Sequence, residues 1–172
     1  TDPSNTGSAT ATDDCSTVTI TSSDVSTQDA DGVAGTCDDY RYTITRTFTA
    51  TDDCGNTSTC SQVITVDDTE APVITCPSDV TVECDESTDP SNTGSATATD
   101  NCSSVTITSS DVSTQDADGV VGTCDDYRYT VTRTWRATDA CGNFSECVQV
   151  ITVDDTEAPV ITCPSDVTVE CD

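Results

Sequence analysis

The chain has 172 residues and a formal net charge of -27, because 32 aspartates and glutamates face five arginines and no lysine or histidine. Such a charge repels nucleic acids and anionic membrane surfaces. The sequence also contains no run of 18 apolar residues, which a membrane-spanning helix would need. A composition this acidic and this poor in large apolar residues is typical of disordered chains. Twelve cysteines and alternating β-branched runs instead predict small folded domains stapled by disulfides.

A tandem repeat dominates the sequence. Residues 1–85 align with residues 88–172 without a gap, and 75 of the 85 positions are identical. Positions that lie 87 residues apart are therefore equivalent. Such near-identity favours array length as the function over a recent duplication without a role for the array.

An acidic linker that ends in a proline, residues 66–72, recurs at 153–159 and marks the boundaries of the repeat. The first repeat (residues 1–67) is then an immunoglobulin-like domain that lacks its first strand. The second repeat (residues 68–154) is complete, and residues 155–172 are the first strand region of a further repeat. We expect the chain to be an internal part of a longer protein.

The apolar residues of the second repeat recur at every second position, which predicts strands rather than helices. In chain order we expect strands near residues 73–77, 80–84, 96–98, 105–107, 127–137 and 147–153, a turn at 139–143, and the same alternation again at 160–164. About seven short strands with closely spaced turns predict an all-β fold of tandem immunoglobulin-like antiparallel β-sandwich domains. Arg133 interrupts the apolar face of its strand, as Arg46 does in the first repeat, and either a bulge or a buried aspartate partner would explain it.

Several motifs of the repeat are similar to those of a known family. They are Thr75-Cys76-Pro77, the strand 79–82, the turn Ala137-Thr138-Asp139-Ala140-Cys141-Gly142-Asn143, Cys147, and the strand 150–153. Together they resemble the HYR (hyalin repeat) domain and the related immunoglobulin-like repeats of large extracellular adhesins of Bacteroidota. The resemblance covers the whole period and implies an extracellular, non-enzymatic repeat used in adhesion or as a stalk.

We expect every cysteine to form a disulfide, which indicates an oxidising, extracellular or cell-surface location, and the lack of histidine and of a CxxC pair argues against zinc. The cysteines are Cys15, Cys37, Cys54, Cys60, Cys76, Cys84, Cys102, Cys124, Cys141, Cys147, Cys163 and Cys171. The resemblance implies a bridge between Cys76 and Cys147. For the other cysteines of the second repeat we expect Cys84–Cys102 and Cys124–Cys141, with Cys141–Cys147 as the competing pair.

Acidic residues cluster in the linker and in the loops that an immunoglobulin-like sandwich would turn toward it. Calcium takes six to eight oxygen ligands, so we expect calcium to bind where these segments meet at a domain junction. The alternative is a solvated acidic surface. The complete site would use Asp67, Asp68, Glu70, Asp100, Asn101, Asp139 and Asn143. Its loop half recurs as Asp13, Asp14, Asp52 and Asn56, and its linker half as Asp154, Asp155 and Glu157.

A second candidate calcium site contains Asp29 and Asp31, repeated as Asp116 and Asp118. The Asp-x-Asp-Gly fragment resembles part of a calcium loop, but the rest of the EF-hand ladder is missing. A tight acidic turn is the alternative.

Catalysis is not expected, because there is no histidine or lysine and no serine or threonine has an activating partner. We expect a structural repeat of a secreted adhesin, stalk or extracellular fibre, and the alternative is a module that binds a glycan or another protein. The expected partners are neighbouring copies of the repeat, including lateral assembly into a filament. The first strand region of one repeat could also complete the sheet of a neighbour.

Overall fold

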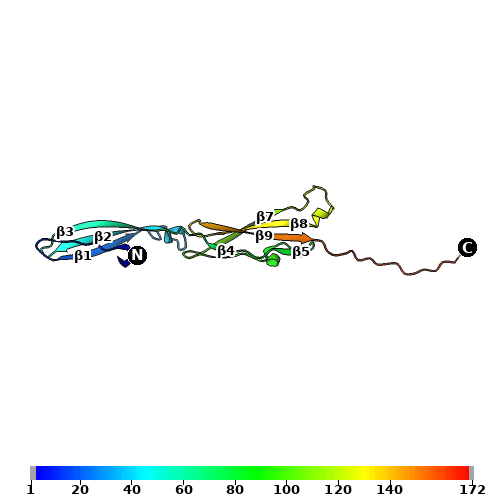
Figure 1. Cartoon of the computed structure of the whole chain (residues 1–172), viewed down its shortest axis with the longest axis horizontal. Coiled ribbons are helices and arrows are strands. Elements are labelled where there is room, and N and C mark those ends of the chain that lie inside the picture. Colours follow the sequence, from blue (N-terminus) through cyan, green and yellow to red (C-terminus); the bar gives the residue numbers. More distant parts are fainter. Residues whose placement is uncertain (1–2, 171–172) are drawn as a thin grey trace. The chain divides into compact units, whose positions relative to one another are not determined.

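The computed structural model describes residues 3–170 and consists mainly of β-strands in antiparallel sheets, with two disulfides (Figure 1). Residue contacts divide the chain into two compact units. Unit 1 comprises the residues up to 76 together with 96–109 and 134–147, and unit 2 comprises 77–95, 110–133 and the residues from 148 onward. These units do not follow the expected repeat boundaries, which remain a prediction. No helix of the described residues is long and apolar enough to cross a membrane.

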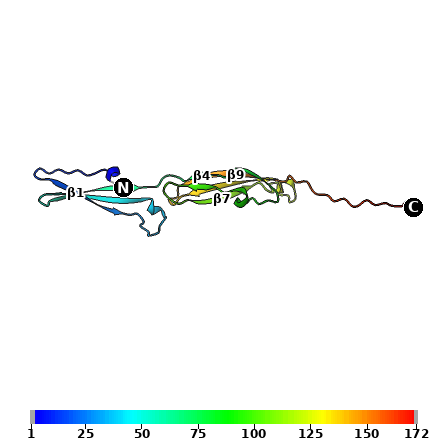
Figure 2. The same cartoon turned by 90° about the horizontal axis from the view of Figure 1, so that it is seen from below.

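The first repeat contributes a three-stranded sheet to unit 1 (Figure 2). The short helix α1 (Pro3–Thr6) is followed by β1 (Val18–Ser26), the 3-10 turn η1 (Cys37–Asp39), β2 (Tyr42–Asp52) and β3 (Thr57–Val66). The strands pair antiparallel in the order β1-β2-β3. Threonine, valine and isoleucine fill these strands, and such residues suit a pleated backbone. One side of β3 therefore forms an open sheet edge in the part of the chain that the structure describes.

The second repeat has two sheets. In unit 1, β4 (Val73–Thr75) pairs antiparallel with β6 (Thr97–Thr99). The other sheet has the order β5-β9-β8-β7, with β5 (Val80–Glu83), β9 (Phe144–Asp154), β8 (Tyr129–Thr138) and β7 (Thr106–Ser113). The helix α2 (Pro90–Thr93) precedes β6, and the 3-10 turn η2 (Cys124–Asp126) precedes β8.

The pairing of β5 with β9 is parallel, so the expectation of a purely antiparallel fold is wrong at this edge. The chain leaves β4 at Thr75, passes through Cys76 and Pro77, and takes a different partner strand when it becomes β5. A proline has no backbone N–H and ends regular pairing, which accounts for the change of partner at this point.

Apolar side chains of alternating strand positions form the buried interior. In unit 2, Val82, Val131, Ile151 and Val153 form one cluster. In unit 1, Ala96, Trp135 and Ala137 are buried. The expected apolar face of residues 127–137 is confirmed from Val131 to Ala137, where all odd-numbered positions are buried, but Tyr127 precedes β8 and is 49% exposed.

An aspartate partner explains the arginine on this face. Arg133 is only 3% exposed, and it donates from Nε and Nη2 to the two carboxylate oxygens of Asp111 at 2.8 and 2.7 Å. Its Nη1 donates to the Thr93 hydroxyl at 3.0 Å. Arg46 holds Asp24 in the same two-bond arrangement, and the two residues lie directly opposite each other in the β1–β2 pair.

The strand expected at residues 160–164 is not formed. Residues 155–170 carry no regular secondary structure and are exposed throughout. A strand needs a partner for its backbone hydrogen bonds, and none of the described strands pairs with this segment. The sequence equivalent to this segment, residues 68–83, does form β4 and β5.

Candidate cation site at the linker

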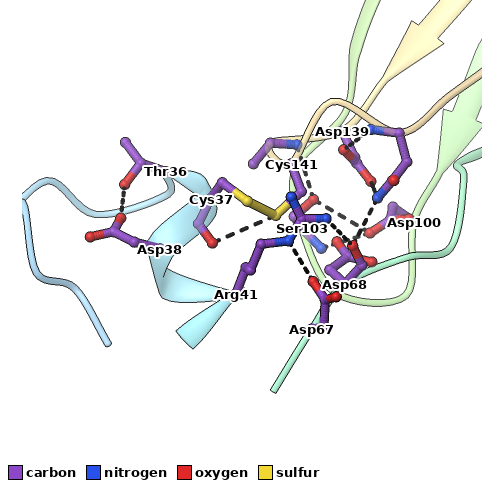
Figure 3. Close-up of a disulfide and its surroundings, with 12 residues drawn as sticks. Thr36, Cys37, Asp38, Arg41, Asp67, Asp68, Asp100, Ser103, Asp139 and Cys141 are labelled. Atoms are coloured by element: carbon purple, nitrogen blue, oxygen red, sulfur yellow. Dashed lines mark hydrogen bonds and ion pairs between the residues drawn. A yellow bond between two sulfur atoms is a disulfide. The ribbon is translucent and has the colours of Figure 1, made fainter. Parts of the chain in front are cut away.

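Three aspartates that are distant in the sequence meet within unit 1. Asp68 follows β3 in the linker, Asp100 follows β6, and Asp139 follows β8. Each offers a carboxylate oxygen, and these oxygens all lie within 4.8 Å of one another. We call Asp68, Asp100 and Asp139 the junction triad. Figure 3 shows their carboxylates beside the Cys37–Cys141 disulfide.

The two loop members of the triad are held by short-range hydrogen bonds. Asp100 Oδ1 accepts the backbone N–H groups of Cys102 and Ser103 at 2.9 and 2.8 Å, which lowers the pKa of this carboxyl below its ordinary value. Asp139 accepts the backbone N–H and the side-chain amide of Asn143, both at 2.8 Å. These turns are typical of aspartates that bond to N–H groups a few residues onward.

The Asp68 carboxylate differs from those of both neighbours in its surroundings. Asp68 is 3% exposed, and neither carboxylate oxygen has a hydrogen-bond partner. Burial raises the pKa of Asp68, and the charges of Asp100 and Asp139 raise it further, against smaller lowering effects of the Glu70 backbone N–H and the Arg41 charge. A buried, unpaired carboxylate is costly, so it normally neutralises or binds a cation.

The backbone of Asp68 is fixed from two sides. Its carbonyl oxygen accepts hydrogen bonds from Arg41 Nη2 and from Asn143 Nδ2, both at 3.1 Å. The first donor belongs to the first repeat and the second belongs to the turn that carries Asp139. These bonds direct the linker so that the Asp68 carboxylate faces the other two members of the triad.

The donor set is suited to a hard divalent cation. Carboxylate oxygens are the ligands that calcium and magnesium prefer, and calcium tolerates irregular geometry with water completing its shell. The carboxylate oxygens of Asp68 would supply ligands directly. The Asn143 amide donates to the Asp68 backbone carbonyl and to the Asp139 carboxylate, and it would position both residues for the cation. The triad is the only set of three such carboxylates in the described residues that meets the distance criterion above.

The remaining predicted ligands of this site lie beside the triad in other roles. Asp67 forms an ion pair with Arg41. Glu70 accepts a hydrogen bond from the Asn101 amide at 2.5 Å. Sequence reasoning missed Arg41, although the acidic linker itself was a signal that a nearby arginine would find a partner there.

The first repeat contains the loop half of the site in the same conformation. Asp13 Oδ1 accepts the N–H groups of Cys15 and Ser16, both at 2.9 Å, as Asp100 does in the second repeat. Asp52 accepts the N–H and side-chain amide of Asn56, which lowers the pKa of Asp52. Asp14 is exposed in the same loop. The loop half thus forms without a linker carboxylate.

The second linker half, Asp154, Asp155 and Glu157, is not joined by loop carboxylates within the described residues. Asp154 pairs with Arg128, while Asp155 and Glu157 are exposed. The expectation of a calcium site at this position stays a prediction.

The second candidate site is an acidic turn in which the carboxylates bind N–H groups. Asp38 accepts the N–H of Asp31 at 2.9 Å, and Asp31 accepts the N–H of Val33 at 2.7 Å. Asp125 and Asp118 repeat this pattern in the second repeat. Asp29 and Asp116 have φ angles of 52° and 53°, which is the left-handed region of a tight turn. Metal binding by Asp29, Asp31, Asp116 and Asp118 stays a prediction.

The disulfides confirm one expected pair and correct others. Cys76 bonds Cys147, as the resemblance implied. Cys141 bonds Cys37 of the first repeat, so the expected pair Cys124–Cys141 and its competitor Cys141–Cys147 are both wrong. The expected pair Cys84–Cys102 is not formed, because Cys102 lies among the triad carboxylates whereas Cys84 lies beside Asp155 and Glu83.

Seven described cysteines are free, and four of them are equivalent to a bonded cysteine in the other repeat. Cys54 and Cys124 are equivalent to the bonded Cys141 and Cys37, and Cys60 and Cys163 are equivalent to the bonded Cys147 and Cys76. Cys15, Cys84 and Cys102 complete the set of free thiols. Cys171 lies outside the described residues.

No protein-family model matches the chain, and no match is found among curated proteins.

Proposed function

We propose that this chain is a structural repeat of a secreted cell-surface adhesin, stalk or extracellular fibre, in which HYR-like, immunoglobulin-like sandwich domains are linked by a disulfide and by calcium. The single observation that carries the proposal is the buried, unpartnered Asp68 in contact range of two further carboxylates. A covalent bond between the repeats, Cys37–Cys141, supports it from the same unit. Disulfides are compatible with an oxidising extracellular location.

Calcium in this proposal neutralises the junction. Three carboxylates within 4.8 Å repel one another, and a divalent cation converts that repulsion into attraction to a common centre. A ligand that binds only the folded form stabilises it. Because the ligands come from the linker and from two loops of the second repeat, binding would hold the linker against those loops and stiffen the junction.

The test is a calcium titration of the monomeric chain, monitored by calorimetry and by thermal melting. An Asp68→Asn variant is measured in the same way. We expect the wild-type chain to bind one calcium ion at this site and to melt at a higher temperature with calcium than with a chelator. Asp68→Asn should lose this calcium effect, yet melt no lower than the wild type in the chelator, because the variant removes a buried charge.

The matched control is Asp155→Asn, which makes the same change at the equivalent, exposed position. It should keep the calcium-dependent rise in melting temperature. A melting temperature of the wild type that does not respond to millimolar calcium would contradict the calcium part of the proposal.

A second candidate function, an adhesive module for a glycan or protein, has one observation in its favour. Phe144 is 47% exposed, and Arg136 stacks 3.5 Å from its ring centroid while forming an ion pair with Glu146. The first repeat has threonine at all three equivalent positions, so this surface cluster distinguishes the copies. Binding to a glycan array that is lost in a Phe144→Thr variant would support this function.

A further inference from the structure

The turn that carries Cys141 holds two members of the junction triad. Asp139 begins this turn, and its carboxylate accepts the N–H and the side-chain amide of Asn143, both at 2.8 Å. The same amide donates to the Asp68 carbonyl at 3.1 Å. Cys141 lies between Asp139 and Asn143 in the chain. Its sulfur is therefore attached to the short turn that makes all of these bonds.

The third member of the triad is bonded to the same turn. Asp100 Oδ1 accepts the N–H of Ser103 at 2.8 Å, and the Ser103 hydroxyl accepts the N–H of Ala140 at 3.3 Å. Ala140 directly precedes Cys141. A displacement of this turn would therefore disturb the arrangement of all three carboxylates.

A turn of the first repeat is bonded to the linker residue of the triad. The 3-10 turn η1 begins at Cys37, and the N–H of Arg41 donates to the Cys37 carbonyl at 2.7 Å. Arg41 Nη2 donates to the Asp68 carbonyl at 3.1 Å, and Arg41 Nε forms an ion pair with Asp67. The carbonyl oxygen of Asp68 thus accepts hydrogen bonds from both turns, beside the disulfide (Figure 3).

The Cys37–Cys141 disulfide closes this arrangement into a ring, all of it within unit 1. One path between the two turns is the S–S bond. The other path runs from η1 through Arg41 to the Asp68 carbonyl, and then through Asn143 to the turn of Cys141. Hydrogen bonds contribute little net stability because water can replace them. The covalent bond is therefore the firmer of the two connections.

The turns themselves do not need the disulfide. Cys54 is free, yet the turn around it has the same two bonds from Asn56 to the Asp52 carboxylate, at 2.8 and 2.7 Å. Cys124 is free, yet the N–H of Arg128 donates to the Cys124 carbonyl at 2.9 Å, as in η1. The disulfide thus shapes neither turn, and what it adds is the placement of one turn against the other.

Repulsion within the triad opposes this placement. Carboxylate oxygens of Asp68, Asp100 and Asp139 lie within 4.8 Å of one another. Asp68 is 3% exposed, and both of its carboxylate oxygens are buried without a hydrogen-bond partner. Charges that are kept from water repel one another more strongly. Without a cation the disulfide holds these groups together against their repulsion, whereas a bound cation would favour the same closeness.

We propose that the Cys37–Cys141 disulfide regulates the junction cation site, so that the oxidised junction binds calcium tightly and the reduced junction binds it weakly. The inference rests on the proposed function, because it takes the junction triad as the calcium site. Reduction breaks the S–S bond and adds two electrons and two protons, which gives one thiol at Cys37 and one at Cys141. The electrons come from a dithiol, which is converted into its own cyclic disulfide.

Coupling of this kind acts in both directions. If the disulfide raises the affinity for calcium, then calcium raises the equilibrium constant for oxidation of the two thiols by the same factor. Coupling between two sites is typically about 5- to 150-fold. We expect a factor of about ten, which for a two-electron couple lowers the reduction potential by about 30 mV.

The experiment compares calcium affinity with and without the bond by isothermal titration calorimetry. The parent is the full chain in its oxidised form, and the variant is Cys37→Ser, Cys141→Ser in the same background. We expect the dissociation constant for calcium to rise about tenfold or more in the variant. All chains carry serine at the cysteines outside the two disulfides, which are Cys15, Cys54, Cys60, Cys84, Cys102, Cys124, Cys163 and Cys171.

The matched control removes the other disulfide. The Cys76→Ser, Cys147→Ser variant loses one bond of the same kind, but neither residue takes part in the hydrogen bonds of the triad described above. Its calcium affinity should stay within about twofold of the parent, as for sites that share no partners. Far-UV circular dichroism checks that each variant is folded.

A redox titration of the parent chain tests the same coupling without a cysteine variant. The chain is equilibrated with mixtures of reduced and oxidised dithiothreitol, in calcium or in a chelator, and free thiols are then alkylated in acid-quenched samples. Peptide mass spectrometry gives the oxidised fraction of each disulfide. Calcium should lower the reduction potential of Cys37–Cys141 by about 30 mV, and that of Cys76–Cys147 by less. Asp68→Asn should abolish the effect of calcium on Cys37–Cys141.

Failure of the proposed function and failure of this inference give different results. If the oxidised parent binds no calcium, the proposed function fails and the inference fails with it. If the parent binds calcium and the Cys37→Ser, Cys141→Ser variant binds it equally well, the calcium site stands and the coupling is wrong. Equal shifts of both disulfides in the titration would mean that calcium acts through overall stability, which would also overturn the coupling.

Discussion

Cys37 in the first repeat is bonded to Cys141 in the second, while their equivalents Cys124 and Cys54 are free. The bond joins one position of a repeat to a different position of the next repeat. A contact of this kind is head-to-tail, and it continues along an array without closing on itself. Each repeat would therefore donate one thiol forward and one backward.

Removal of this bond should destabilise the chain. The Cys37→Ser, Cys141→Ser double variant opens a loop with a sequence separation of 104, for which the chain-entropy model gives about 4–5 kcal/mol, and measured losses are about 2–5 kcal/mol. We expect a loss of free energy of unfolding in this range from urea denaturation. A Cys15→Ser variant, which changes an exposed free thiol, should stay within about 0.5 kcal/mol of wild type. Equal midpoints for both would show that the bond adds no stability.

The buried carboxyl of Asp68 predicts a pH dependence that calcium reverses. Its pKa is raised in the folded chain, so the protonated form is favoured by folding. In a chelator, this contribution is complete below the ordinary aspartate pKa of about 3.9 and is lost as pH rises through the raised value. Calcium needs the ionised form, so its stabilisation should grow over the same interval.

Thermal melting between about pH 4 and pH 7, with and without calcium, measures this reversal. The Asp68→Asn variant should have a flatter profile in the chelator than the wild type and no calcium-dependent rise. A wild-type profile identical to that of Asp68→Asn in the chelator would contradict the assignment of the effect to this carboxyl.

Replacement of Arg133 by lysine should destabilise the chain, although the positive charge is kept. Arg133 is 3% exposed and holds both carboxylate oxygens of Asp111, and the guanidinium fork lowers the pKa of Asp111. The Asp111 side chain is 37% exposed, so the expected loss is that of hydrogen bonds to a charged group, about 1.5–3 kcal/mol. Arg133→Lys should therefore destabilise the chain in urea, because an ammonium cannot make the two parallel bonds. The exposed Arg128→Lys serves as the control and should cost less than about 1 kcal/mol.

Much of the fold could be predicted because it depends on local pattern. The period-two alternation predicted the strands around Val131 and Ile151, and it showed that Arg133 required either a bulge or an aspartate partner. The loop carboxylates Asp100 and Asp139 were also predicted, since a turn that follows a strand is visible in the sequence. These features are set by residues close to one another along the chain.

The disulfide between the repeats, the state of residues 160–164 and the burial of Asp68 could not be predicted, because they depend on contacts between repeats. A sequence of six cysteines per repeat does not reveal that Cys37 bonds forward to the next repeat, because pairing depends on how the linker directs successive domains. Residues 160–164 have the pattern of a strand but form none, because a strand also requires a partner edge. Asp68 was predicted among seven ligands, but only its burial distinguishes it from Asp67.

The surroundings of two free thiols predict a slow reaction with alkylating reagents. Burial raises the pKa of Cys102, and the carboxylates of Asp68 and Asp100 raise it further. Burial raises the pKa of Cys84, and the carboxylate of Asp155 raises it further.

The thiolate is the reactive form of cysteine, so a raised pKa slows alkylation of the thiol. Iodoacetamide labelling followed by peptide mass spectrometry should therefore modify Cys84 and Cys102 more slowly in the folded chain than in the chain unfolded by urea. Equal labelling rates in the folded and unfolded chains would contradict the effect of the neighbouring carboxylates.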